Sequence, residues 1–156
     1  MKRKLGWAVA LTLLAGCQLP PQEQEQLRPL REHGHGLDYD QLIERARSQA
    51  DNLTRLSFQD RWTDLQDLLT ALEQTAQLIP KSAGVPADKK AEVQKTSARI
   101  VELTRKLQTT VVDVVKLAGK EAEQRKKISE ANDLFRDINV AVRSLPPKGP
   151  VPPSPE

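Results

Sequence analysis

The amino-acid sequence predicts an all-α protein, an antiparallel four-helix bundle with a disordered N-terminal tether and a proline-rich tail. Between residues 37 and 145, apolar side chains recur every three or four positions, which is the spacing of one helix face. No segment shows the alternation of apolar and polar residues that is typical of a strand, and aromatic residues make up only 3% of the chain. We therefore expect no β-sheet.

Four amphipathic runs predict helices at about 38–55, 58–79, 87–118 and 121–145. Each run carries a narrow apolar stripe, widened by neighbours such as Ile43, Leu68 and Val111, as expected for helices that pack in a bundle. The stripe residues are Tyr39, Leu42, Ala46, Gln49, Leu53 and Leu56; Trp62, Leu65, Leu69, Leu72, Ala76 and Ile79; Val93, Thr96, Ile100, Leu103, Leu107, Thr110, Val114 and Leu117; and Ile128, Ala131, Phe135, Ile138, Val142 and Leu145.

Three local signals set the helix boundaries. The segment "PKSAGVP", from Pro80 to Pro86, separates the second helix from the third because proline cannot continue a helix. Ser57 and Asp60 fit a capping box, which places a tight turn before the second helix. The apolar phase runs on past Gly119, so the last two runs could form one long helix. We expect a turn at Gly119, because a continuous stripe would have to bury Glu121.

Charge supports the folding of these helices onto one another. Residues 38–80 hold eight acidic and four basic side chains, whereas residues 81–148 hold nine acidic and fifteen basic ones. Opposite net charges favour the packing of the first helical pair on the second, although each exposed ion pair contributes only about 0.2 to 1 kcal/mol.

The N-terminus has the organisation of a bacterial export signal, in which the basic cluster "MKRK" precedes an apolar run too short to span a bilayer. The run ends at Leu14-Ala15-Gly16-Cys17, which resembles the lipobox of bacterial lipoprotein precursors. That resemblance implies cleavage before Cys17 and attachment of acyl chains to it, including palmitate. The alternatives are an ordinary export signal with an incidental thiol, or a buried free cysteine.

A lipidated Cys17 would hold the mature protein on a membrane of the cell envelope without a transmembrane helix. Gln18 follows the cysteine, where an aspartate would resemble an inner-membrane retention signal. We therefore expect the outer membrane, facing the periplasm. Loss of Lys2, Arg3 and Lys4 with the signal leaves 21 basic and 21 acidic residues. The mature chain then lacks the positive net charge that would favour a nucleic-acid partner.

These features divide the chain into four parts: a signal peptide (1–16), a lipidated cysteine with a flexible tether (17–36), a helical bundle (37–145) and a disordered tail (146–156). The tether is rich in glutamine, proline and glutamate, and the tail "PPKGPVPPSPE" is too proline-rich for a helix. We expect the tail to contribute little to the stability of the bundle.

The order of the helices in residues 37–145, with a proline-bounded loop and a glycine turn, is similar to that of four-helix bundles of the cytochrome c-prime type. Members of that family carry a C-x-x-C-H haem attachment on the closing helix. Here the corresponding segment is Ile138-Asn139-Val140-Ala141-Val142, and the methionine of the chain, Met1, leaves with the signal. The resemblance implies the fold, and we expect no haem or other cofactor.

Neither a metal site nor catalysis is expected. His33 and His35 precede Asp38 and Asp40, which are metal-binding residue types, but a closed site needs four ligands on a stable frame. In a flexible tether these residues would bind a metal only weakly. Asp64 and Asp67 share a helix face, as solvated carboxylates commonly do. The mature chain has no free thiol and no glycine-rich phosphate loop, so we expect no enzymatic activity.

The sequence thus predicts an envelope lipoprotein with a structural or protein-interaction role, offering a helix face or its proline tail to a partner. The alternative is a small-molecule carrier that holds its ligand between the helices. The stripes are filled with leucine, valine and isoleucine, which favours the interaction role over an internal pocket.

Overall fold

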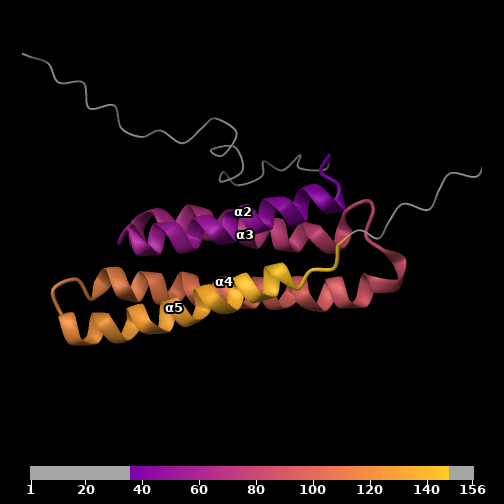
Figure 1. The fold of residues 1–156 in the computed structure, drawn as a ribbon. Helices are drawn as coiled ribbons and strands as arrows, with labels where there is room; N and C mark the ends of the chain where they lie inside the picture. Colours follow the sequence, from indigo (N-terminus) through magenta and orange to yellow (C-terminus); the bar gives the residue numbers. More distant parts are fainter. Residues whose placement is uncertain (1–35, 148–156) are drawn as a thin grey trace, which may run out of the picture.

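A computed structural model describes residues 36–147 of the chain (Figure 1). It contains four α-helices and no strand within those residues, so the all-α prediction is confirmed. Three short 3-10 helices lie at helix ends: η1 (Trp62–Asp64), η2 (Ile79–Lys81) and η3 (Ala87–Lys89). The α-helices are α2 (Tyr39–Phe58), α3 (Leu65–Leu78), α4 (Lys90–Lys116) and α5 (Glu121–Arg143).

The helices lie in two layers, α2 with α3 and α4 with α5, and each helix turns back along the one before it (Figure 1). Contacts join α2 to α3, α3 to α4, α4 to α5 and α5 to α2, which closes the bundle. The α4–α5 pair is longer and extends beyond the turn between α2 and α3 (Figure 1). The described ribbon begins and ends at the opposite end of the bundle (Figure 1), where Tyr39 contacts Pro146. We call this the entry end.

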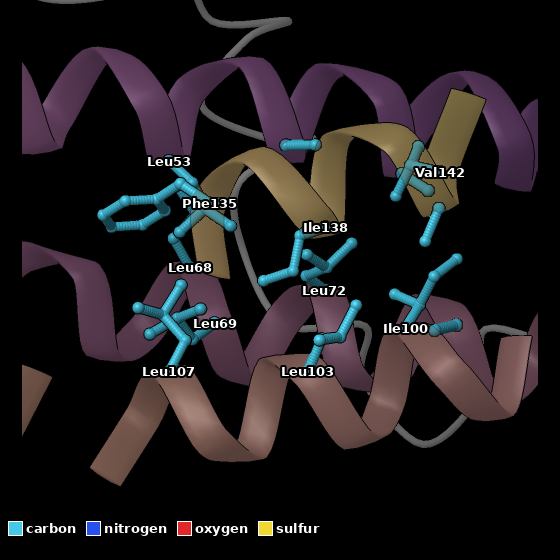
Figure 2. Close-up of a cluster of buried hydrophobic side chains, with 14 of the residues drawn as sticks. Leu53, Leu68, Leu69, Leu72, Ile100, Leu103, Leu107, Phe135, Ile138 and Val142 are labelled. Carbon is cyan, nitrogen blue, oxygen red and sulfur yellow. The ribbon is translucent and has the colours of Figure 1, made fainter. Parts of the chain in front are cut away.

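One apolar core runs through the bundle, and all four helices contribute to it (Figure 2). Side chains such as Leu53, Leu72, Ile100 and Ile138 enter this core from different helices (Figure 2). Removal of this aliphatic surface from water is the main force that holds the helices together, at about 25 cal/mol per Å² buried. Trp62 and Phe135 pack against each other at the edge of the core, with ring centroids 6.4 Å apart.

The predicted stripes match the buried residues closely, and the widening neighbours Ile43 and Leu68 are also buried. Leu117 and Ile128 are only half-buried, because the ends of α4 and α5 extend past the other pair of helices. On α4, Thr96 is half-buried while its neighbour Ser97 is buried. A straight helix drifts by about 20° per seven residues, which shifts a strict heptad stripe in this way.

The predicted capping box at Ser57 and Asp60 is wrong. The Ser57 hydroxyl donates to the Thr54 carbonyl at 2.8 Å, and α2 continues to Phe58. Asp60 has a positive φ of 53°, and the Arg61 amide donates to the Leu56 carbonyl at 3.1 Å. These residues therefore form a helix C-terminal motif that ends α2, and they do not begin the next helix.

The predicted turn at Gly119 is confirmed, since α4 ends at Lys116 and α5 begins at Glu121. Gly119 has φ of +88°, a conformation that glycine adopts at little cost. Glu121 is exposed, and half-buried Gln124 donates to the Val114 carbonyl at 3.2 Å. The turn thus spares the chain from burying Glu121.

The proline-bounded break after the second predicted helix is also confirmed, with η2 ending at Lys81 and η3 beginning at Ala87. The packed part of the chain extends one residue further than the predicted boundary at 145. Pro146 is buried, and its carbonyl accepts a hydrogen bond from Tyr39. Residues 1–35 and 148–156, which include the predicted signal and most of the predicted tether and tail, lie outside the described residues.

The charge distribution acts between the layers as predicted. Arg105 of α4 contacts Glu73 of α3 at 2.8 Å, and Arg143 of α5 contacts Asp51 of α2 at 3.3 Å. In both ion pairs the cation comes from the α4–α5 layer and the carboxylate from the α2–α3 layer. Arg143, Asp51 and Arg105 are largely exposed and Glu73 is half-buried, so the pairs orient the layers more than they stabilise the fold.

Candidate functional site

The residues that the sequence marks for lipid or metal binding, Cys17, His33 and His35, lie outside the described residues. The described chain begins at exposed Gly36, and Leu37 already packs against the core. The point at which the predicted tether joins the bundle is therefore defined, and it lies at the entry end.

The first turn of α2 is fixed by side chains and backbone together. Asp38 accepts a hydrogen bond from the Gln41 amide at 2.9 Å, and the Gln41 side chain accepts one from the Asp38 amide at 3.0 Å. This capping box satisfies two backbone donors that a helix start leaves without partners. The spacing Asp-x-x-Gln is visible in the sequence, although our prediction did not use it.

Tyr39 is the central side chain of the entry end. It is 0% exposed, and its hydroxyl donates to the carbonyl of Pro146 at 2.7 Å. Its backbone amide donates to the carbonyl of Ala83, in the loop between α3 and α4, at 3.0 Å. One residue at the start of α2 therefore contacts two segments that are far from it in the sequence. The apolar period predicts that Tyr39 is buried but gives no sign of either partner.

Burial of the Tyr39 phenol raises its pKa above the ordinary value of 10, and the negative charges of Asp40 and Glu92 raise it further. Both effects disfavour the phenolate. The hydroxyl therefore keeps its proton under physiological conditions and remains a hydrogen-bond donor to the Pro146 carbonyl.

The charged residues singled out in the sequence lie on the solvent face. Asp64 and Asp67 are both exposed, and Asp64 accepts a hydrogen bond from Arg61 at 2.6 Å. In the segment "KEAEQRKK", Arg125 pairs with Glu121, four residues away on the same helix. No group of three or more potential metal ligands occurs within residues 36–147.

The segment aligned with a haem attachment motif is used for packing. Ile138 and Val142 lie in the core, and Asn139 donates to the Thr54 hydroxyl of α2 at 3.0 Å. Val140 points outward and is 61% exposed. This stretch of α5 therefore joins α5 to α2.

Two hydroxyl groups inside the bundle were not anticipated from the sequence. Ser97 and Thr104 of α4 are buried, and the hydroxyl oxygen of neither has a hydrogen-bond partner in the part of the chain described. They lie seven residues apart, on the same face of α4. Small polar residues at helix spacing within an apolar run are the only signal that could have identified them.

Four large apolar side chains within residues 36–147 are exposed. Phe58, at the end of α2, is 85% exposed, Val112 and Val115 near the end of α4 are partly exposed, and Val140 lies on α5. Exposed apolar side chains in this number are ordinary on a protein surface. No helix within residues 36–147 has the length and hydropathy required to cross a membrane.

Comparison with known protein families, with curated proteins and with solved structures finds no match. The features on which a function can be argued are therefore those of this chain alone: the N-terminal segment ending in Cys17, the entry end of the bundle, and the filled core.

Proposed function

We propose that this chain is a lipid-anchored protein of the bacterial cell envelope with a non-catalytic structural or interaction role. Residues 1–16 are its signal peptide, Cys17 carries the lipid, and residues 18–36 are a flexible tether with an r.m.s. length of roughly 25 Å. The helical part is an antiparallel four-helix bundle that resembles the cytochrome c-prime type without a haem. The observation that carries the proposal is the sequence Leu14-Ala15-Gly16-Cys17 behind an apolar run.

The side chains of the bundle serve core packing and contact with solvent, which supports this role. Its large aliphatic residues fill one core, and the carboxylates singled out in the sequence, Asp64 and Asp67, are exposed. An anchored protein of this design offers its outer surface to a partner. The entry end, where α2 begins, would lie nearest to the membrane because the tether joins the bundle there.

Replacement of Cys17 by alanine tests the anchor directly. We expect the Cys17→Ala protein to lose metabolic fatty-acid labelling and to leave the membrane fraction. Density-gradient flotation of the unaltered protein should place it with outer membranes, on the grounds that Gln18 follows the cysteine. Continued labelling of the Cys17→Ala protein would contradict the proposal, and flotation with inner membranes would contradict the location.

A carrier of a small apolar ligand is the second candidate, and the buried hydroxyls of Ser97 and Thr104 are the observation that favours it. A ligand inside the bundle, beside α4, could use them as hydrogen-bond partners. Native mass spectrometry of protein isolated from its envelope distinguishes the candidates. A bound small molecule that is lost in a Ser97→Ala, Thr104→Val variant supports the carrier, whereas a co-purified protein supports the interaction role.

A further inference from the structure

Within the described residues, the segment that follows α5 is held on the bundle by burial of two side chains and by one long-range hydrogen bond. Ser144 ends the helix, Leu145 and Pro146 are buried, and Pro147 is exposed. The bond from the Tyr39 hydroxyl to the Pro146 carbonyl is 2.7 Å long and joins residues 107 positions apart. We call residues 144–147 the strap.

The chemistry of the strap suits a fixed connection. Pro146 and Pro147 have restricted φ angles and no amide hydrogen, so they cannot extend α5 or rearrange into a new helical turn. A stiff segment loses little conformational entropy when it is held in place. The Pro146 carbonyl is buried, so loss of the Tyr39 donor would leave it without a partner, at a cost well above that of an exposed hydrogen bond.

Tyr39 is also the first residue of α2, directly after the predicted tether, and its amide is bonded to Ala83. The start of the bundle and the start of the tail are therefore attached to the same side chain. We propose that Tyr39 latches the strap across the entry end, so that the start and the end of the bundle are coupled. Displacement of the strap frees the first turn of α2, and loosening of that turn frees the strap.

This coupling limits how a partner can act on the tail. A partner that binds beyond Pro147 leaves the latch closed, whereas one that takes hold of Pro146 must break the bond to Tyr39. The second kind of binding would transmit a change from the tail to the base of the tether. The coupling does not depend on lipidation of Cys17, so it can be tested on the chain from Gln18 to Glu156, independently of the anchor.

Amide hydrogen exchange followed by NMR measures the latch at the amides of Tyr39, Gln41 and Leu42. We expect Tyr39→Phe to raise their exchange rates about fivefold, the change that corresponds to roughly 1 kcal/mol for one hydrogen bond. Deletion of residues 146–156 should raise the rates at least as much, because it removes buried Pro146 together with the bond. Addition of Tyr39→Phe to the deletion should raise them no further, because the deletion has already removed the acceptor.

Two controls isolate the strap from other effects. Ser82→Ala removes a hydroxyl near the same end of the bundle, one that donates locally to the Ile79 carbonyl at 2.7 Å. Deletion of residues 148–156 removes the tail but keeps the strap. Both should leave the three exchange rates within about twofold of the unaltered chain.

Three results would overturn the latch: unchanged exchange in Tyr39→Phe, effects that multiply in the combined variant, or a deletion of residues 148–156 that acts as strongly as deletion of residues 146–156. If the chain lacking residues 146–156 does not fold, the comparison of Tyr39→Phe with Ser82→Ala decides the question alone.

Discussion

At the scale of single residues, the contribution of a side chain to this fold follows from where its helix face points. Leu72 and Val140 are both aliphatic residues inside helices, yet Leu72 is fully buried and Val140 is 61% exposed. The period of three and four separates the two in the sequence, because Leu72 falls on a predicted stripe and Val140 does not.

The effect of removing a core side chain can be predicted from that difference. Leu72→Ala leaves a cavity in the core, so we expect a loss of about 2 to 5 kcal/mol in the free energy of unfolding. Val140→Ala is the matched control on an exposed position and should change stability by less than about 0.5 kcal/mol. Chemical denaturation measures both free energies, and equal losses would contradict the position of Leu72 in the core.

Tyr39 predicts how stability depends on pH. Its pKa is raised in the folded chain, so the folded state keeps the phenolic proton at pH values where the unfolded chain releases it. This contribution to stability is complete below about pH 10, the pKa of an unfolded tyrosine, and is lost as pH rises through the folded pKa.

We therefore expect the thermal midpoint to fall above about pH 10 and to fall less steeply in Tyr39→Phe, which has no proton to lose. Thermal unfolding from pH 8 to pH 11, followed by circular dichroism, measures the difference between the two proteins. Parallel pH profiles would contradict a raised Tyr39 pKa.

At the scale of the elements, the helices are set by periodicity, but their ends depend on individual residues. Proline disrupts the interior of an α-helix, and Pro80 and Pro86 both lie in the break between α3 and α4 as predicted. The sequence predicts that Ser57 to Asp60 begin a helix, but in the structure these residues end α2. Serine and aspartate suit a helix start, and only the packing of Trp62 in the core and the conformation of Asp60 show that they end α2.

The turn between α4 and α5 gives a test at this scale. Gly119 has φ of +88° and no atom within 4 Å of an added Cβ, so Gly119→Ala is opposed by backbone strain alone. We expect a loss of roughly 1 to 2 kcal/mol in the free energy of unfolding.

Gly36→Ala is the control for that substitution, since Gly36 also has open space around it and lies outside the positive-φ region. It should leave stability nearly unchanged. If Gly119→Ala were equally neutral, the left-handed conformation at residue 119 would be wrong.

At the scale of the whole molecule, the four helices share one core, so we expect them to unfold together. Of the two tryptophans, Trp7 lies in the predicted signal peptide, which leaves Trp62 as the probe of the mature chain. It packs in the core against Phe135 of α5. Urea unfolding curves from Trp62 fluorescence and from circular dichroism should coincide. Separate midpoints would mean that the α2–α3 and α4–α5 layers unfold independently.

The class of fold, the four helices, nearly every core residue and the breaks at Pro80 and Gly119 can be predicted from the sequence alone, because each depends on a local period or on the chemistry of one residue. The argument for Cys17 likewise rests on the sequence. The packing of the helices was needed to establish that Ser57 to Asp60 ends α2, that Ser97 and Thr104 lie inside, and that Pro146 belongs to the packed part of the chain. The bond from Tyr39 to Pro146 joins residues 107 positions apart. Such a contact forms only after all four helices have packed, so no local pattern of residues predicts it.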